Sequence, residues 1–268
     1  MVARALIDGD VVAYRAAAGA TQVIQWEAEV ASVAVYPDRA ADVAVRTVRE
    51  WASLANVGEP IVCLSSPHNF RKVLLPTYKA GRKPKPEAYP AAVAALRAAY
   101  DTREVAGLEA DDLLGILLTT PKYAGSVVLT IDKDLRTVPG LHLNPDKETF
   151  PGLVSEGKAN LMWLMQSLHG DSTDNYSGVP GIGPKKAAKI LAGLDCTDPL
   201  IGWGRVVGTY RAHGLTDADA ITTTRVARIL RRADYDKSSK EVLLWHPRTP
   251  PRLPLARFSS ASTLTPPT

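Results

Sequence analysis

The chain has 268 residues, of which 46% are hydrophobic and 22% are charged, and its formal net charge at pH 7 is +4. This composition is typical of a globular protein that buries a substantial core. No segment approaches the roughly 18 consecutive apolar residues of a membrane-spanning helix, and the first residues do not resemble a signal peptide. We therefore expect no membrane partner and a cytoplasmic protein. Cys63 and Cys196 lack the spacing of a zinc site or a disulfide framework.

Short apolar runs alternate with helical patterns over residues 1–153. The runs are typical of buried parallel strands and lie at residues 5–7, 60–64 and 126–131. Helical periodicity covers three further segments, at residues 40–54, 87–100 and 109–118. The alternation predicts an α/β fold in which helices cover both faces of a twisted parallel sheet. In such sheets the ligand crevice lies at the carboxyl ends of the strands.

From residue 154 onward the pattern becomes helical. We expect helices and then a short strand, at residues 159–168, 184–191, 199–213, 217–232 and 241–245. Residues 246–268 are rich in proline and have few periodic apolar positions, which predicts an extended or disordered tail. The sequence thus predicts an α/β core at 1–153, a helical region at 154–245 and a tail.

Carboxylates occur in tight groups at the ends of the predicted elements. We assign eight of these carboxylates to a metal site, namely Asp8, Glu109, Asp111, Asp112, Asp132, Asp134, Asp171 and Asp174. Asp10 lies two residues after Asp8 and is not among the eight. Each group alone also fits a helix cap or a turn. Together, however, acids that face one crevice repel each other unless a cation is present. Oxygen ligands without His or Cys favour Mg²⁺ or Mn²⁺, and two such ions serve the hydrolysis of phosphodiesters. The pattern therefore predicts a two-metal nuclease.

A basic segment follows the second predicted strand. Residues 68–86 contain six Lys or Arg and no acid, with Phe70 and Tyr78 among them. A solvated loop is the alternative interpretation, but cations interleaved with aromatic rings are typical of single-stranded nucleic-acid binding. We name residues 67–90 the basic arch. Its candidate nucleic-acid contacts are Arg71, Lys72, Tyr78 and Lys83.

The sequence GVPGIG at residues 178–183 predicts a glycine hairpin between two helices. Pro184 then favours the first position of the following helix. The free N–H groups at that helix start would bind a phosphate backbone without reading bases. The candidate backbone contacts are Gly178, Gly181, Gly183, Lys185, Lys186 and Lys189. A generic glycine turn is the alternative.

Taken in order, these motifs resemble those of the phage-type 5′-nucleases, the flap-endonuclease-like 5′→3′ exonucleases, with the T7-like phage members most similar. The resemblance runs from LIDGD at residues 6–10 through NFRK, YKAGRK, EADDLLG, TIDKDLRTVPG and GDSTDNYSGVPGIG to residues 226–245. It implies a PIN-like α/β nuclease core and a helix-hairpin-helix-type region that binds DNA. It further implies an enzyme encoded by a phage and active in the bacterial cytoplasm, and we expect a monomer. The implied substrates are DNA with 5′ ends or flaps, with primers in RNA–DNA hybrids as a further candidate.

The resemblance also implies residue roles. The first of two divalent ions would lie near Asp8 and the 109–112 acids, and the second near Asp134, Asp171 and Asp174, with the catalytic Asp132 between them. Lys79 and Arg82 match arch residues that engage the scissile phosphate, and Tyr78 is a candidate stacking partner for a terminal base. Backbone carbonyls of the glycine hairpin would hold a K⁺ ion.

The chain departs from the family pattern at one position. Where the family has an acid just before the arch, this sequence has Ser65-Ser66-Pro67, so Ser66 supplies no charge to the first metal ion. Two alternatives to an active nuclease therefore stay open. One is a DNA-junction-binding protein that has lost catalysis, and the other is a PIN-type ribonuclease.

Overall fold

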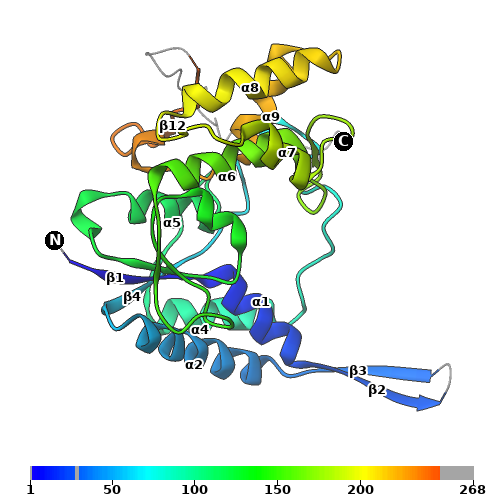
Figure 1. Ribbon diagram of the computed structural model, residues 1–268. Coiled ribbons are helices and arrows are strands. Elements are labelled where there is room, and N and C mark those ends of the chain that lie inside the picture. Colours follow the sequence, from blue (N-terminus) through cyan, green and yellow to red (C-terminus); the bar gives the residue numbers. More distant parts are fainter. Residues whose placement is uncertain (1, 28–29, 248–268) are drawn as a thin grey trace, which may run out of the picture.

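The computed structural model describes residues 2–27 and 30–247 (Figure 1). Its centre is a six-stranded sheet with the order β5-β4-β1-β6-β7-β8. The strands are β1 Arg4–Asp8, β4 Gly58–Cys63, β5 Asp101–Arg103, β6 Val127–Leu129, β7 Gly140–Leu143 and β8 Gly152–Val154. All neighbours pair in parallel except β8, which runs antiparallel to β7. The predicted α/β fold is therefore confirmed, with an antiparallel edge strand added.

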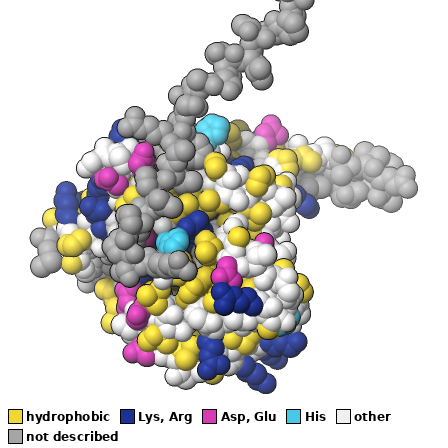
Figure 2. All heavy atoms as spheres, turned by 90° about the horizontal axis from the view of Figure 1, so that it is seen from above, with side chains coloured by type: hydrophobic (Ala, Val, Ile, Leu, Met, Phe, Trp, Pro, Cys, Tyr) yellow, Lys and Arg dark blue, Asp and Glu magenta, His cyan; other side chains and the backbone are white. Residues whose placement is uncertain are grey.

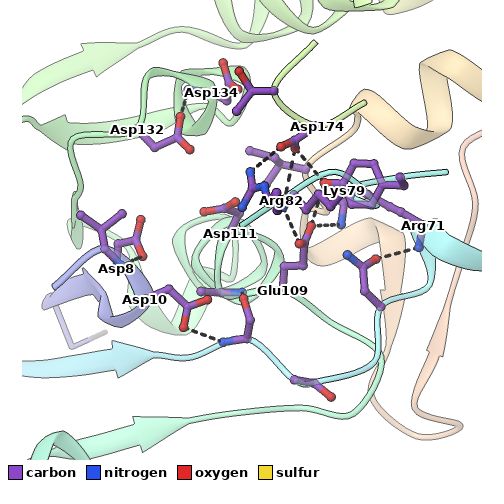
Figure 3. Close-up of a pocket in the computed structure, with 18 of the residues that line it drawn as sticks. Asp8, Asp10, Arg71, Lys79, Arg82, Glu109, Asp111, Asp132, Asp134 and Asp174 are labelled. Carbon is purple, nitrogen blue, oxygen red and sulfur yellow. Dashed lines mark hydrogen bonds and ion pairs between the residues drawn. The ribbon is translucent and has the colours of Figure 1, made fainter. Parts of the chain in front are cut away.

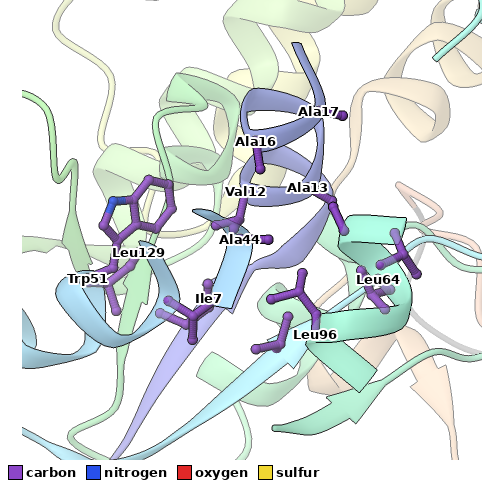
Figure 4. Close-up of a cluster of buried hydrophobic side chains, with 14 of the residues drawn as sticks. Ile7, Val12, Ala13, Ala16, Ala17, Ala44, Trp51, Leu64, Leu96 and Leu129 are labelled. Atoms are coloured by element: carbon purple, nitrogen blue, oxygen red, sulfur yellow. The ribbon is translucent and has the colours of Figure 1, made fainter. Parts of the chain in front are cut away.

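Side-chain alternation along the strands divides the interior into two layers. Ala5 and Ile7 of β1 face one hydrophobic cluster, while Leu6 between them faces another. The first cluster lies beneath three helices, α1 Gly9–Gly19, α2 Pro37–Ala55 and α4 Tyr89–Ala99 (Figure 4). The second lies beneath α5 Ala110–Leu118. Strands buried on both faces explain why the sequence shows continuous apolar runs here.

The helical region packs around a third cluster. Its helices are α6 Glu156–His169, α7 Pro184–Leu191, α8 Pro199–Ala212 and α9 Asp217–Ala227. Trp245 lies edge-on to two indole rings, with centroid distances of 5.0 Å to Trp163 and 5.2 Å to Trp203. A β hairpin with two residues in each strand, β9 Gly170–Asp171 and β10 Tyr176–Ser177, joins α6 to the glycine hairpin.

The helix predicted to reach residue 232 ends earlier, at Ala227, so that part of the prediction is wrong. The next residues are extended, and Ile229 and Leu230 join the cluster beneath α5. A β-carbon on Gly115 of α5 would lie 2.3 Å from the Leu230 carbonyl oxygen, so the segment and the helix are in close contact. Residues 229–244, expected in the helical region, therefore complete the second layer of the α/β core. They include β11 Tyr235–Asp236 and β12 Glu241–Val242.

Two further segments complete the described chain. An antiparallel ribbon, β2 Thr21–Glu27 with β3 Val30–Val35, which the sequence analysis did not predict, projects away from the body (Figure 1). The basic arch contains one short helix, α3 Arg71–Leu74, before it reaches α4. Within the described ranges, no helix combines the length and apolar character needed to cross a membrane. The predicted tail lies outside the described residues from 248 onward.

Candidate active site

A pocket of about 760 Å³ lies at the carboxyl ends of β1, β4 and β6 (Figure 3). Its wall contains Asp8 at the end of β1, Ser65 and Ser66 beyond β4, and Asp132 beyond β6. The start of α5, the basic arch and the β9–β10 turn close it from the other sides. The crevice is where the parallel sheet predicts it.

The pocket brings together residues that are far apart in the sequence. Seven of the eight predicted metal ligands line it, namely Asp8, Glu109, Asp111, Asp132, Asp134, Asp171 and Asp174. The arch residues Lys79 and Arg82 line it as well. Asp112 does not, and neither does the glycine hairpin with its three lysines.

Asp8 is fixed by its position at the junction of β1 and α1. Its Oδ1 accepts the Val11 N–H at 3.1 Å as the cap of α1, and its Oδ2 accepts the Thr130 hydroxyl at 2.8 Å. The side chain is 2% exposed. Burial first, and then the nearby Asp10, raise the pKa of Asp8 to about 7.

Burial and neighbouring negative charges also raise the pKa of two other carboxylates. Burial, and then Asp8 and Asp132, raise the pKa of Asp111 well above its ordinary value. Burial, and then Asp132 and Asp171, raise the pKa of Asp134 to about 7. Raised values mean that these groups prefer to share protons or a cation rather than stand ionised side by side.

The donor set on this side fits a hard divalent cation. The ligands available are carboxylate oxygens, and their mutual repulsion would be relieved by positive charge. Across the described residues, no three His, Cys, Asp or Glu side chains are close enough to form a single preformed ion cage. The carboxylates instead border the pocket from several elements.

On the opposite side of the pocket the carboxylates already have cationic partners. Lys79 Nζ pairs with Glu109 Oε1 and lies 3.6 Å from Asp174 Oδ2, and Arg82 pairs with Asp174 Oδ1. Burial acts to raise the pKa of Glu109, but Arg71 and Lys79 outweigh it and hold that pKa below its ordinary value. Lys79 adopts a φ of 57°, a left-handed conformation rare for a residue with a β-carbon. Its N–H donates to the Asp174 carbonyl at 2.8 Å, which helps to hold that conformation.

Two predicted site residues are instead structural. The Arg71 guanidinium donates to both oxygens of Asp112, at 2.7 and 2.8 Å, and to the carbonyls of Val226 and Arg228. Asp112 is fully buried, and it also accepts the N–H groups of Glu109 and Leu230. Asp112 therefore has no free oxygen for a metal ion and lies outside the pocket, which contradicts its predicted role as a ligand. Arg71 borders the pocket, but it is 2% exposed and its guanidinium is held by acceptors in the core, so its predicted nucleic-acid contact gains no support here.

Tyr78 is also placed differently from the prediction. Its ring is 3% exposed, and its hydroxyl lies 3.0 Å from both Glu109 Oε2 and Asp174 Oδ2. Tyr78 borders the pocket, but its ring has almost no exposed face for a base in this structure, so its predicted stacking role gains no support here. Lys72 and Lys83 are exposed on the arch, where they are accessible to a polyanion.

The glycine hairpin is built by close packing. A β-carbon on Gly178 would lie 2.2 Å from the Leu168 carbonyl, and Gly181 has a φ of 72°. Gly183 caps α7, on which Lys185, Lys186 and Lys189 are exposed. The Lys186 ammonium donates to the Gly181 carbonyl at 2.8 Å. Figure 2 shows the molecule from above, with Lys and Arg side chains in several separate groups.

Two pocket residues, Asp10 and Tyr89, were not among the predicted site residues. Asp10, in the first turn of α1, points into the pocket, and its Oδ1 accepts the Ser65 N–H at 3.3 Å and the Tyr89 hydroxyl at 2.9 Å. Tyr89 lies on α4, 79 residues away in the chain. The repeated acid in the DGD motif was the available signal for Asp10, whereas nothing local in the sequence indicated Tyr89.

Comparisons with known proteins identify the family and the fold. A family model described as the 5′-3′ exonuclease, N-terminal resolvase-like domain, matches residues 3–142. An exodeoxyribonuclease of Enterobacteria phage T3 is 29% identical over 91% of this chain and 93% of its own. An exonuclease of Escherichia phage T7 is 28% identical over 90% and 93%. A solved 5′-exonuclease of phage T5 with bound zinc superposes with a TM-score of 0.57 at 17% identity, over 84% of this chain and 93% of that one.

Proposed function

This chain belongs to the 5′-3′ exonuclease family, and on that premise we propose that it cleaves DNA near 5′ ends. The reaction is hydrolysis of phosphodiester bonds by a divalent-metal-dependent 5′→3′ exonuclease or 5′ flap endonuclease. One observation carries the proposal: a single pocket sets repelling carboxylates opposite Lys79 and Arg82. Such a pocket suits a phosphate that arrives together with divalent cations.

Two Mg²⁺ or Mn²⁺ ions would be held by the carboxylates that lack a cationic partner. Asp8 and Asp111 would hold the first, Asp134 and Asp171 the second, and Asp132 would lie between them. Glu109 and Asp174 border the same sites but are shared with Lys79 and Arg82. When bound, the ions supply an acidified water and neutralise the charge on the leaving oxygen.

The chain's own cations would bind and orient the scissile phosphate. Lys79 and Arg82 are anchored by Glu109 and Asp174, so their charges face the pocket without rearrangement of the arch. Cations that are already fixed in place stabilise a charged transition state better than cations on flexible side chains do. A phosphate that enters would share the two cations with the carboxylates that now hold them.

The duplex would be gripped away from the pocket. The exposed lysines of α7 and the free N–H groups at its start suit a phosphate backbone of any sequence. A K⁺ ion at the glycine hairpin would compete with the Lys186 ammonium for the Gly181 carbonyl. We further propose that the protein acts as a monomer in phage DNA replication in the bacterial cytoplasm, with RNA primers in RNA–DNA hybrids as a second substrate.

The test is a Mg²⁺ and Mn²⁺ titration of cleavage on a 5′-labelled duplex that carries a 5′ flap. We expect metal-dependent release of short 5′ products from the wild type and none from Asp132→Asn. Tight duplex binding without cleavage at any metal concentration would instead support a DNA-junction-binding protein, a possibility that the neutral Ser66 keeps open. Preferential cleavage of single-stranded RNA would support the ribonuclease alternative.

A further inference from the structure

The end of β4 is the one strand terminus in the pocket that carries no acid of its own. Ser65 and Ser66 occupy it, and both line the pocket. The Ser65 hydroxyl accepts the Ala110 N–H at 2.9 Å, and the Ser66 hydroxyl lies 3.4 Å from the His68 N–H. Both hydroxyls are therefore engaged in holding the local backbone.

A carboxylate from another element reaches this place. Asp10 extends from the first turn of α1 to the end of β4, where its Oδ1 accepts the Ser65 N–H at 3.3 Å (Figure 3). The approach depends on Gly9, because a β-carbon there would lie 2.6 Å from the Cys63 carbonyl. The absence of a side chain at residue 9 thus allows α1 to bring the acid across.

Tyr89 fixes the orientation of this carboxylate. Its hydroxyl donates to the same Oδ1 at 2.9 Å, and the residue is only 9% exposed. Among the described residues no hydrogen bond is donated to Oδ2, and Asp10 lines the pocket, so this oxygen is available to a cation there. Lys85 of the arch lies 3.9 Å above the Tyr89 ring and holds its outer face.

An acid in the first turn of a helix is also favoured by the helix dipole alone. That explanation accounts for an acid at residue 10 but not for a buried tyrosine hydroxyl 79 residues away that aims it. Outer hydrogen-bond partners of this kind are typical of residues that coordinate metal ions.

We propose that Asp10 is a metal ligand of the first divalent site and supplies, through Oδ2, the charge that Ser66 does not. Tyr89 is its positioning residue. The inference rests on the proposed function, because it presupposes that the pocket holds a divalent ion.

The test measures Mn²⁺ binding to the full chain without DNA, by calorimetry and by the electron paramagnetic resonance of free Mn²⁺. We expect Asp10→Asn to weaken binding roughly 100-fold and Tyr89→Phe roughly tenfold. Adding Ser66→Asp to Asp10→Asn should recover most of the lost affinity, because it returns a carboxylate to the same strand end. Asp38→Asn, which removes an exposed acid from the first turn of α2, is the matched control and should bind like the wild type.

Two results would overturn the inference. One is unchanged Mn²⁺ affinity in Asp10→Asn, and the other is a loss that Ser66→Asp does not repair in a variant whose thermal unfolding matches the wild type. Cleavage of the flap substrate by the wild type is followed in parallel. If the wild type binds Mn²⁺ but cleaves nothing, the proposed function fails while the binding data still decide the role of Asp10.

Discussion

The two sides of the pocket use the same side chains in opposite electrostatic states. On one side Glu109 and Asp174 are paired with Lys79 and Arg82, and the pKa of Glu109 is held low. On the other, within the described part of the chain, Asp8 has no ion pair and its pKa is raised to about 7. A carboxylate with its counter-ion in the chain positions that cation, whereas under the proposed function one without it would bind a cation from solution.

The largest expected effect comes from breaking the most deeply buried pair. Arg71→Met would leave Asp112 as an uncompensated charge in the core, and we expect it to lower the free energy of unfolding by about 3–5 kcal/mol. Chemical denaturation measures this. Arg46→Met, which removes an exposed pair with Glu50, should cost less than about 1 kcal/mol. Equal losses in the two variants would contradict the distinction between buried and exposed pairs.

Removing a carboxylate that has no cationic partner should reduce activity without lowering stability. We expect Asp111→Asn to reduce cleavage roughly 100- to 1000-fold, because the pocket loses charge that would hold a cation. Without divalent ions the same variant should melt at a higher temperature than the wild type, since repulsion with Asp8 and Asp132 is relieved. A lower melting temperature would show that Asp111 is a structural acid like Asp112.

The stability of the protein also depends on pH through His142, which lies outside the pocket. This contribution has to be measured before the pH dependence due to the carboxylates can be interpreted. Burial lowers the pKa of His142 to about 4, and its Nε2 lies 2.9 Å from the Val138 carbonyl. The unfolded chain therefore takes up the proton first as pH falls. The contribution of neutral His142 to the free energy of unfolding should be fully present above about pH 6.5. It should decline by up to roughly 3 kcal/mol as the pH falls to 4.

His142→Gln should remove this slope, which denaturation at a series of pH values would reveal. The pH dependence that is left then reports the carboxylates, whose raised pKa values act in the opposite direction. A slope unchanged by the substitution would place the titrating group elsewhere.

The smallest effect is expected from cations that face solvent. Removing Lys189, exposed on α7, should lower the slope of log affinity for duplex against log salt by about 1, equally for all DNA sequences. Titrations at several salt concentrations measure the slope. An effect confined to one sequence would indicate base recognition instead of backbone contact.

The sequence predicted the fold well because the relevant signals are local. The apolar run at residues 5–7 became β1, and the helix predicted at 184–191 has those bounds in the structure. The ribbon of β2 and β3 went unpredicted, because its apolar residues did not stand out as strands between α1 and α2. Element type followed from periodicity, but a ribbon that projects from the body has no core pattern to reveal it.

The site was predicted less completely, because the direction of a side chain is a tertiary property. Asp111 and Asp112 are neighbours at the start of one helix, yet only the first lines the pocket. Nothing in the run of acids indicated that Arg71, 41 residues away, would claim both oxygens of Asp112. Likewise, an aromatic residue between two basic motifs predicted stacking for Tyr78, whereas its neighbours in space placed it in the core.

The end of α9 and the extended segment that follows it have a consequence for the design of shorter fragments of this protein. Arg71 takes two of its acceptors from Val226 and Arg228, and Asp112 takes a donor from Leu230. A fragment that stops at residue 153 would lose all three, together with the apolar cover over α5. We therefore expect a fragment of residues 1–153 to lack part of its own core, although a family model matches residues 3–142.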